Sequence, residues 1–390
     1  DFRLYWLALA VSLLGVAFQT VAQGWLVYRL TNSAFMLGFT AFLPGVLSAP
    51  ASIVGGVLAD RLSRRKLVAV TQSLMVIPPI ALAYLIWSMK VQVWHVILAS
   101  TALGIVAALD LPSRMAMIPH LVDEEDVLNA QGLASAVRQV TRIVGPVTAG
   151  LVIATAGEAA CFLINGLSYL AMVAAVLMMR PQPALLQNPQ GGLRSTLLEG
   201  SAYVVRSPVI LGLFGMLAAQ GLFLSPYLTL MPVYARDVLN VGAVGLGWLN
   251  AAVGAGALVG ALTVANLGQG QRGRVLVAGS AVMPLALGAY SFSRSYPLSL
   301  GLLTVMGFGT VVITAITATM LLVIVPDRIR GRVNSLGTLV YLGAPYTAGV
   351  VIGFLTERWG PAPPLSAAAS LFLVAIILLN LRVPGLRELA

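Results

Sequence analysis

Three charged side chains interrupt or end long apolar stretches of this chain and are the residues best placed to do chemistry there. Asp110 ends one apolar stretch, and Arg138 and Arg142 lie inside another. If that second stretch is a helix beginning near Gln131, Arg142 lies about 16 Å along it. Ionised groups at such a depth must pair with an opposite charge or face a water-filled cavity. Two roles are open: the arginines attract an anionic ligand, or Arg142 forms a buried ion pair with Asp110, whose carboxyl is also the best candidate for carrying a proton.

A second group of candidate residues is polar but uncharged and is spread over several apolar stretches. Gln19 and Gln23 share one helical face, and Gln220 and Tyr227 share another. The remaining members are Asn165, Asn250, Thr314 and Tyr341. Amides, phenols and hydroxyls among apolar neighbours suit an apolar or amphipathic small molecule better than a sugar or an inorganic ion. The sequence therefore predicts a neutral substrate cavity, although a threonine in such a helix often bonds only to its own backbone.

Enzymatic and metal chemistry find little support in the sequence. One cysteine (Cys161) and two histidines (His95 and His120) are too few for a His/Cys metal site. The chain has no P-loop, Gly-x-Ser-x-Gly or His-Glu-x-x-His pattern. A polytopic lipid-modifying enzyme would have to use His120 with the acidic residues 123–126, which fit a solvated helix start better. We expect no metal, no cofactor and no catalytic residue.

The elements that position these residues are long apolar helices. The chain has 390 residues, is 59% hydrophobic and only 9% charged, and has a mean hydropathy of +0.93. Eleven stretches of nineteen or more residues lack Asp, Glu, Lys and Arg: 4–28, 30–59, 67–89, 91–109, 159–179, 207–235, 238–271, 275–293, 295–326, 333–356 and 359–381. A spanning helix needs about 20 apolar residues. With a twelfth candidate at 130–156, the sequence predicts an all-α polytopic membrane protein with twelve transmembrane helices.

The positive charges predict how these helices are oriented. With the N-terminus in the cytoplasm, sixteen Lys and Arg residues fall on the cytoplasmic side and five on the outer side. Cytoplasmic loops carry such an excess, so both termini are expected to be cytoplasmic. The net charge of +10 is therefore a topology signal, and nucleic-acid binding is disfavoured. The preference for Arg over Lys, with many Ala and Gly residues, suggests a bacterial cytoplasmic membrane.

The chain divides into two similar halves of six helices. The expected divisions are an N-terminal bundle over 1–180, a cytoplasmic linker over 181–206 and a C-terminal bundle over 207–390. The linker is polar, and its segment 193–205 could form an amphipathic helix on the membrane surface. The fifth helix of the first half contains PVTAG (146–150), and its counterpart in the second half contains PYTAG (345–349). Repeats of this kind indicate a pseudo-symmetric transporter that holds its substrate between two bundles.

The loop between the second and third helices carries a concentrated charge motif. The pattern Gly-x-x-x-Asp-Arg-x-x-Arg-Arg-Lys closely resembles the signature loop of the major facilitator superfamily, with Ser63 where that family usually has glycine. The matching residues are Gly56, Asp60, Arg61, Arg64 and Arg65. We expect Asp60 to face either the positive start of the eleventh helix, near Val333, or the cluster of Arg328, Arg330 and Arg332 there. By this resemblance, the contact locks the inner ends of the two halves together while the transporter faces outward.

A second motif lies in the fifth helix, in the segment RQVTRIVGPVTAG. It is similar to the antiporter signature of the same superfamily, and Gly145, Pro146 and Gly150 occupy the positions of its Gly-Pro step and following small residue. The segment 110–154 and the later VPDRIRGRVNSL resemble the enterobactin-exporter and multidrug-efflux branch. The resemblance implies a monomer that exports drug-like or siderophore-like molecules by alternating access, coupled to protons. A facilitator or importer of an organic anion, using Arg138 and Arg142, is the alternative.

Overall fold

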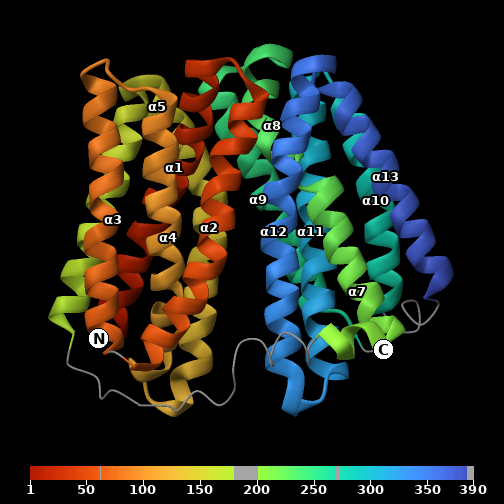
Figure 1. Ribbon diagram of the computed structural model, residues 1–390, viewed down its shortest axis with the longest axis horizontal. Coiled ribbons are helices and arrows are strands. Elements are labelled where there is room, and N and C mark those ends of the chain that lie inside the picture. The colour runs from red at the N-terminus through yellow and green to blue at the C-terminus, as the bar shows by residue number, and fades with distance from the viewer. Residues whose placement is uncertain (62, 180–200, 269–271, 384–390) are drawn as a thin grey trace. The chain divides into compact units, whose positions relative to one another are not determined.

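The computed structural model describes residues 1–61, 63–179, 201–268 and 272–383, and over these residues the chain is helical with no strand (Figure 1). Eleven described helical segments are long and apolar enough to cross a membrane. The longest, Glu124–Met178, is broken at Gly157, whose φ of 79° and ψ of 172° are not helical. This segment therefore supplies two spans, and the described chain holds the twelve that the apolar stretches predict. The all-α polytopic fold is confirmed.

Contacts group the chain into two compact units. The N-terminal unit comprises Asp1–Pro189 with Val241–Ala251, and the C-terminal unit comprises Gln190–Asn240 with Ala252–Ala390. The linker predicted over 181–206 lies mostly outside the described residues, so its amphipathic helix stays a prediction. Of that segment, residues 201–206 are described and helical.

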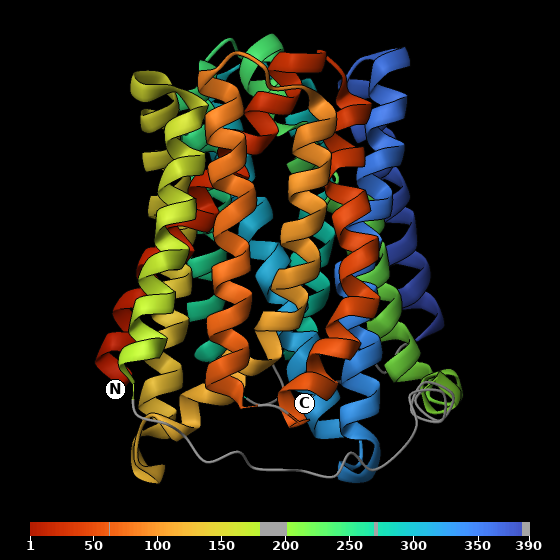
Figure 2. The same cartoon turned by 60° about the vertical axis from the view of Figure 1, so that its left-hand side comes forward.

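Five helices build most of the N-terminal unit. They are α1 (Phe2–Thr31), α2 (Ala34–Arg61), α3 (Arg64–Trp87), α4 (Val93–Met117) and α5 (Val127–Met178), with short 3-10 turns at Ile118–His120 and Glu124–Asp126. The helix α5 packs against α1 and α3, and α2 packs against α4. Figure 2 shows α3 and α4 of this unit running alongside one another. Helices that pack on several neighbours in this way are mainly apolar, so the polar contacts between them help to fix which helices are neighbours.

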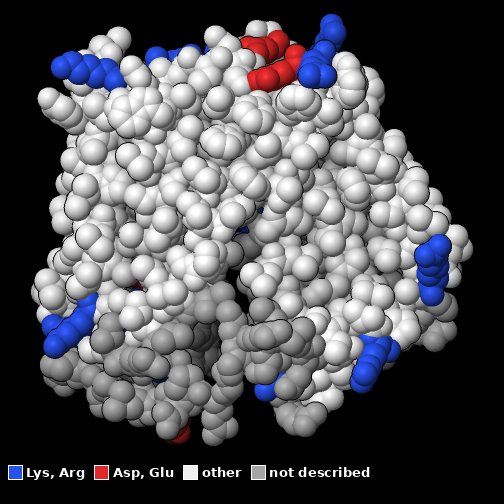
Figure 3. All heavy atoms as spheres, viewed as in Figure 1, with Lys and Arg blue, Asp and Glu red and all other residues white. Residues whose placement is uncertain are grey.

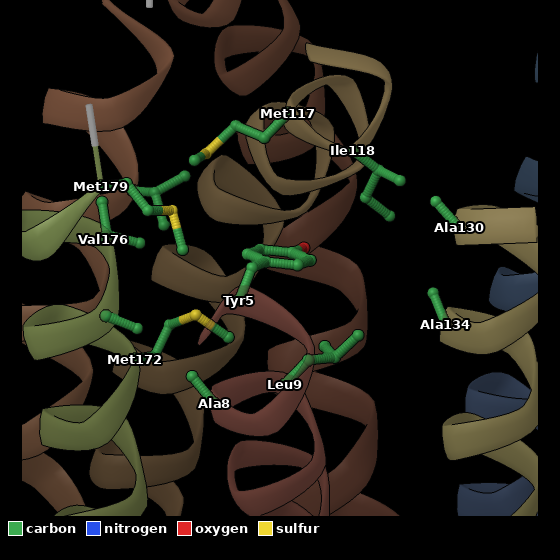
Figure 4. Packing of buried hydrophobic residues seen from close by; sticks show 12 residues of the cluster. Tyr5, Ala8, Leu9, Met117, Ile118, Ala130, Ala134, Met172, Val176 and Met179 are labelled. Carbon is green, nitrogen blue, oxygen red and sulfur yellow. The ribbon is translucent and has the colours of Figure 1, made fainter. Parts of the chain in front are cut away.

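One apolar cluster joins α1 to both parts of α5 and to the end of α4 (Figure 4). Tyr5, Ala8 and Leu9 contribute from α1, and Met117 from α4. Buried partners on α5 are Ala130, Ala134, Met172, Ala175 and Val176. The Tyr5 hydroxyl donates a hydrogen bond to the carbonyl of Arg114 at 3.3 Å, which gives the polar end of this buried ring a partner. The cluster fixes α1 beside the end of α4, where the charged residues lie.

The first long span of the C-terminal unit alternates twice between α-helical and π-helical geometry. Its elements are α7 (Pro208–Ala219), the π turn η3 (Gln220–Leu224), α8 (Tyr227–Val233) and the π turn η4 (Tyr234–Val238). Pro226 precedes α8 and Pro232 lies inside it. Proline cannot donate the helical hydrogen bond, and π turns absorb the resulting change in register. The two prolines of this span thus lie between its two π turns.

The remaining helices of the C-terminal unit are long and regular. They are the part of α9 (Gly242–Ala265) that follows residue 251, α10 (Arg272–Phe292), α11 (Tyr296–Ile324), α12 (Asp327–Trp359) and α13 (Ala362–Arg382). The helix α10 packs against α11 and α13, and α12 packs against α7, η3 and α13.

Glycines let α9 and α11 approach each other backbone to backbone. A Cβ placed on Gly256 would lie 1.8 Å from the carbonyl oxygen of Thr304, and one on Gly260 would lie 2.7 Å from that of Phe308. From the other side, a Cβ on Gly307 would lie 2.1 Å from the carbonyl oxygen of Val253. Small residues four apart commonly allow such contact between membrane helices, and Gly256 and Gly260 have this spacing.

We expect Gly256→Ala to destabilise the protein by about 1–3 kcal/mol, because the new methyl group can be accommodated only by moving the α11 backbone. Gly301→Ala is the matched control, since a Cβ there meets nothing within 4 Å. Unfolding in detergent, followed by circular dichroism, measures both. Equal midpoints for the two variants would contradict the close approach.

Candidate functional site

Asp110 lies at the centre of the polar contacts in the N-terminal unit and is completely buried. Its Oδ1 accepts a hydrogen bond from the Thr71 hydroxyl at 2.6 Å, and its Oδ2 accepts one from Nε2 of Gln72 at 2.9 Å. One helical turn further along α4, the Nε of Arg114 lies 2.5 Å from Oδ2. This nitrogen lacks hydrogen-bond alignment, so Arg114 acts as a neighbouring charge rather than as an aligned donor. The carboxylate thereby ties α3 to α4.

The expected ion pair between Asp110 and Arg142 is wrong. Asp110 pairs with Arg114, while the side chains of Arg138 and Arg142 on α5 are exposed. The Arg138 guanidinium donates to the hydroxyl of Ser135 at 2.9 Å. Arg114 prevails because it is on the same helix, four residues from Asp110, where side chains meet with no long-range packing needed. The two α5 arginines form no ion pair among the described residues, which favours the other reading, attraction of an anion.

The basic motif after α2 is only partly described. The backbones of Gly56, Asp60 and Arg61 are helical, but their side chains lie outside the described set, so the expected lock at Asp60 stays a prediction. The Nε of Arg65 donates to the carbonyl of Val176 at 2.8 Å, and its second nitrogen contacts the carbonyl of Leu177. A cation at the carbonyl-rich end of a helix is favourable. Arg65 thus joins the start of α3 to the end of α5.

Arg64 and Ser63, which lie beside Arg65 in this loop, also make contacts. The terminal nitrogen of Arg64 lies 2.7 Å from Nε2 of His120, which follows α4. Ser63 stands where the superfamily usually has glycine, and its hydroxyl accepts a hydrogen bond from the backbone N–H of Lys66 at 3.5 Å. Serine is a favourable residue at a helix N-cap. The departure from the family pattern therefore supplies the cap of α3.

The Gly-Pro segment of α5 is a close-packing surface. A Cβ on Gly145 would lie 2.5 Å from the side chain of Ala17 on α1. A Cβ on Gly150 would lie 2.7 Å from the carbonyl oxygen of Ala243, at the start of α9, which groups with the N-terminal unit. Pro146 lies between them, inside the helix. The three residues of this motif thus let α5 approach α1 and α9, and whether they act in antiport stays a prediction.

Two predicted cavity residues, Gln19 and Asn165, bond to each other. The Nδ2 of Asn165 donates to Oε1 of Gln19 at 2.5 Å, and both side chains are buried. The same nitrogen lies 3.3 Å from the Tyr169 hydroxyl, and Ser168 donates to the Asn165 carbonyl at 2.8 Å. Gly15 makes room for this cluster, because a Cβ there would lie 2.3 Å from the Ser168 hydroxyl. The arrangement cross-links α1 to the second part of α5.

Gln220 and Tyr227 are buried in the C-terminal unit. The Nε2 of Gln220 donates to the carbonyl of Thr310 at 3.5 Å, and its Oε1 has no hydrogen-bond partner in the described chain. The Tyr227 ring meets that of Tyr290 edge-on at 6.4 Å, and Tyr290 stacks on Tyr234 at 4.6 Å. Such aromatic pairs add stability beyond their buried area. These residues therefore hold the irregular seventh span against α10 and α11.

Two other predicted cavity residues do line a cavity. It has a volume of about 500 Å³, lies within the C-terminal unit and is bounded by Leu217, Thr314, Ala315, Ala318, Leu321, Leu322, Gly337, Thr338 and Tyr341. Thr314 and Tyr341 are the two residues that the sequence singles out. Gln23 and Asn250 are half-buried, and Asn250 donates to the carbonyl of Leu246 on its own helix at 2.9 Å. Binding of substrate by any of the predicted residues stays a prediction.

The sequence does not identify some of the residues that take part in these contacts. Thr71 and Gln72, the partners of Asp110, are ordinary polar residues in an apolar stretch, and nothing in their spacing points to α4. Gly337, which opens the cavity, carries no signal that separates it from the other glycines. Arg29 and Glu158 form an ion pair at 2.7 Å that could have been found, because both flank long apolar stretches and fall on the same predicted side.

Among the side chains that the structure describes, no group of three His, Cys, Asp or Glu residues could hold a metal ion. Lys, Arg, Asp and Glu lie mainly towards the ends of the helices on the face drawn in Figure 3, and the surface between them is mainly uncharged. Twelve apolar spans, a buried carboxylate and a neutral cavity together define a multi-pass membrane protein of the transporter class.

The family follows from comparison with known proteins. The family described as transmembrane secretion effector, part of the major facilitator superfamily, matches residues 1–390, and the chain belongs to it. This membership makes the protein a transporter rather than an enzyme.

The relatives include an exporter, and solved transporters have a similar fold. The chain is 27% identical to the enterobactin exporter of Shigella boydii serotype 18, over 99% of this chain and 92% of that protein. A bacterial homolog of the human lysosomal transporter Spinster has a similar structure, with a TM-score of 0.76 at 13% identity, covering 99% of this chain and 95% of the other. A D-xylose-proton symporter matches with a TM-score of 0.73 at 13% identity over 98% of each chain. The structural matches support the fold alone.

Proposed function

We propose that this protein is a secondary active transporter that exports hydrophobic or amphipathic small molecules of siderophore-like chemistry. It works by alternating access, as a monomer in the bacterial cytoplasmic membrane with both termini in the cytoplasm, and exchanges its substrate for protons. Membership of the family and the similarity to an enterobactin exporter support export. The charge distribution of the sequence supports the orientation.

The observation that carries the substrate class is the cavity of the C-terminal unit. Of the nine lining residues that the structure describes, none is charged, and six are alanine, leucine or glycine. Burying an ionised group in such surroundings is costly unless a partner neutralises it. A neutral, largely apolar ligand meets no such cost. The volume of about 500 Å³ is in the range of sites for small organic molecules.

Asp110 is the residue proposed to carry the coupling proton. Among the carboxylates whose side chains are described, Asp110 and Glu158 are buried, and Glu158 pairs with the half-exposed Arg29. Buried ionisable residues within membrane spans commonly mark proton relays. Uptake of a proton by Asp110 would weaken its attraction to Arg114 and change its hydrogen bonds with Thr71 and Gln72. The contact between α3 and α4 would then respond to protonation.

A second candidate function is facilitated movement or import of an organic anion. The observation that favours it is the exposure of Arg138 and Arg142 one turn apart on α5, since the carboxylate expected to neutralise Arg142 is engaged by Arg114. This function predicts counterflow of the anion that does not depend on pH. It also predicts that Arg142→Gln abolishes binding of the anion while the protein stays folded.

Dye movement in everted membrane vesicles tests the proposal. Vesicles from cells that produce the protein are expected to accumulate a lipophilic fluorescent dye when a pH gradient is imposed, and addition of the dye should collapse that gradient. Vesicles without the protein are the control, because apolar dyes also partition into lipid. Dye accumulation equal in both preparations would overturn the proposed export, and accumulation that ignores the gradient would leave an uncoupled facilitator.

A further inference from the structure

The polar groups of the cavity in the C-terminal unit are few, and all are uncharged. The cavity is bounded by α7, α11 and α12, and among the lining residues that the structure describes, those with hydrogen-bonding side chains are Thr314, Thr338 and Tyr341. Each of these three side chains carries one hydroxyl group.

The hydroxyl of Thr314 uses its only hydrogen in a bond within its own helix. Its hydroxyl donates to the carbonyl of Thr310 at 2.9 Å, and the carbonyl of Val311 lies at 3.2 Å. Thr314 is one of the residues that line the cavity, and because a hydroxyl has one hydrogen and two lone pairs, its oxygen can still accept a hydrogen bond but cannot give one. A ligand that meets Thr314 must supply the hydrogen.

Tyr341 faces the same cavity from α12 with a half-exposed ring. The side chain is 44% exposed, so its apolar face is available for packing and its hydroxyl can donate or accept. Aromatic rings of this kind supply a large, rigid contact area together with a polar end. The pair Thr314 and Tyr341 therefore combines one acceptor with one apolar platform.

We infer that this cavity selects an uncharged apolar group that carries a hydrogen-bond donor, a hydroxyl or an N–H, which is given to the oxygen of Thr314. The inference rests on the proposed function, because it assigns the exported molecule to this cavity. Ligands whose only polar atoms are acceptors bind less well, since they cannot donate to the remaining lone pairs of Thr314, whose hydrogen is already bonded to Thr310. Carboxylates are disfavoured, because none of the described lining residues is positively charged.

Gly337 sets the width of the cavity. A Cβ on this buried residue would lie 3.7 Å from the ring of Phe214 and 3.8 Å from a methyl group of Leu321, which is ordinary van der Waals contact. A methyl group at position 337 therefore fits without moving the backbone, and this position lies one helical turn from Tyr341. Gly343, on the same helix, has nothing within 4 Å of its Cβ and does not line the cavity.

Binding of three related coumarins to the full chain in lipid nanodiscs tests this selection. The probes are umbelliferone, which has a donor hydroxyl, its methyl ether, which lacks the donor, and its carboxylated derivative, which adds a charge. Equilibrium dialysis at mildly acidic pH, with empty nanodiscs subtracted, measures binding separately from partition into lipid. We expect umbelliferone to bind about two- to tenfold more tightly than its ether, the effect of one hydrogen bond, and the carboxylate to bind most weakly.

Substitutions link the selection to the named residues. Thr314→Val is expected to bring the affinities of umbelliferone and its ether together, whereas Thr319→Val, whose hydroxyl also bonds to its own helix but lies outside the cavity, leaves their ratio unchanged. Gly337→Leu is expected to weaken all three probes at least about tenfold, and Gly343→Leu none. Circular dichroism and size-exclusion profiles identical to the native protein establish that each variant is folded.

The outcomes separate this inference from the proposed function. A preference for umbelliferone that survives Thr314→Val, or tight binding of the carboxylate, would overturn the donor selection even if vesicles still export dye. If the native protein prefers umbelliferone, loses this preference in Thr314→Val and moves no dye in vesicles, the result would support ligand selection by the cavity and count against export.

Discussion

Replacing Asp110 with leucine is expected to lower the free energy of unfolding by about 3–5 kcal/mol, the usual cost of removing one member of a buried ion pair. The change leaves the Arg114 charge without its partner in a largely buried position, where its side chain is only 17% exposed. It also removes the acceptor for Nε2 of the buried Gln72, whereas the Thr71 hydroxyl keeps the Leu67 carbonyl at 2.9 Å as an acceptor. An unsatisfied buried donor at Gln72 adds to the cost.

A double replacement identifies the source of that loss. Asp110→Leu with Arg114→Met removes both charges and fills the space with apolar atoms, and it should recover a large part of the stability. Detergent unfolding monitored by circular dichroism measures single and double variants. If the double variant is as unstable as Asp110→Leu, the orphaned arginine is not the cause.

A matched comparison comes from the other ion pair of the N-terminal unit. The side chain of Arg29 is 45% exposed, and its Nε lies 2.7 Å from Oε1 of Glu158. This pair lies at the ends of the helices that are remote from Asp110. Because water can solvate Arg29 once its partner is gone, Glu158→Leu should cost no more than about 1 kcal/mol. Equal effects of the two carboxylate replacements would mean that burial of Arg114 does not control the outcome.

The spans and their order can be predicted from the sequence because membrane crossing depends on local properties. A stretch without charge of the right length is sufficient, and even the break between the fifth and sixth spans is marked by Gly157 followed by Glu158. Small residues such as Gly256 and Gly260 likewise predict a close helix contact, because a missing side chain is visible in the sequence. These features need no knowledge of which helix is the neighbour.

Side-chain partners could not be predicted where they depend on packing between distant helices. Gln19 and Asn165 were expected to face substrate, yet they bond to each other, because α1 and the second part of α5 are neighbours. The pairing of Asp110 with Arg114 follows from their spacing of four residues, whereas the depth of Arg142 along its helix does not show which group lies beside it. Thr314 and Tyr341 reach the same cavity from helices whose contact no local pattern indicates.

The coupling role proposed for Asp110 leads to the second large effect. Asp110→Asn preserves the size of the side chain, and its amide oxygen can still accept from Thr71 or Gln72, but it cannot exchange a proton. We expect everted vesicles with this variant to lose the collapse of the pH gradient on dye addition entirely, while dye still moves down its own concentration gradient. We therefore expect this variant to lose proton coupling while the path for the dye stays intact.

Two conservative variants show whether that loss is specific to Asp110. Glu158→Gln alters the other buried carboxylate, which pairs with Arg29 at the far end of α1, and should leave gradient collapse intact. Asp60→Asn alters the signature loop and should slow dye movement and gradient collapse in proportion, since a conformational contact sets the rate of both.

If Asp110→Asn still couples dye to protons, the carboxylate serves only to join α3 to α4, and the proton must bind elsewhere. If all three variants and the native protein move dye without regard to the gradient, protons are not the coupling ion, and the exposed Arg142 becomes the group whose removal should abolish transport.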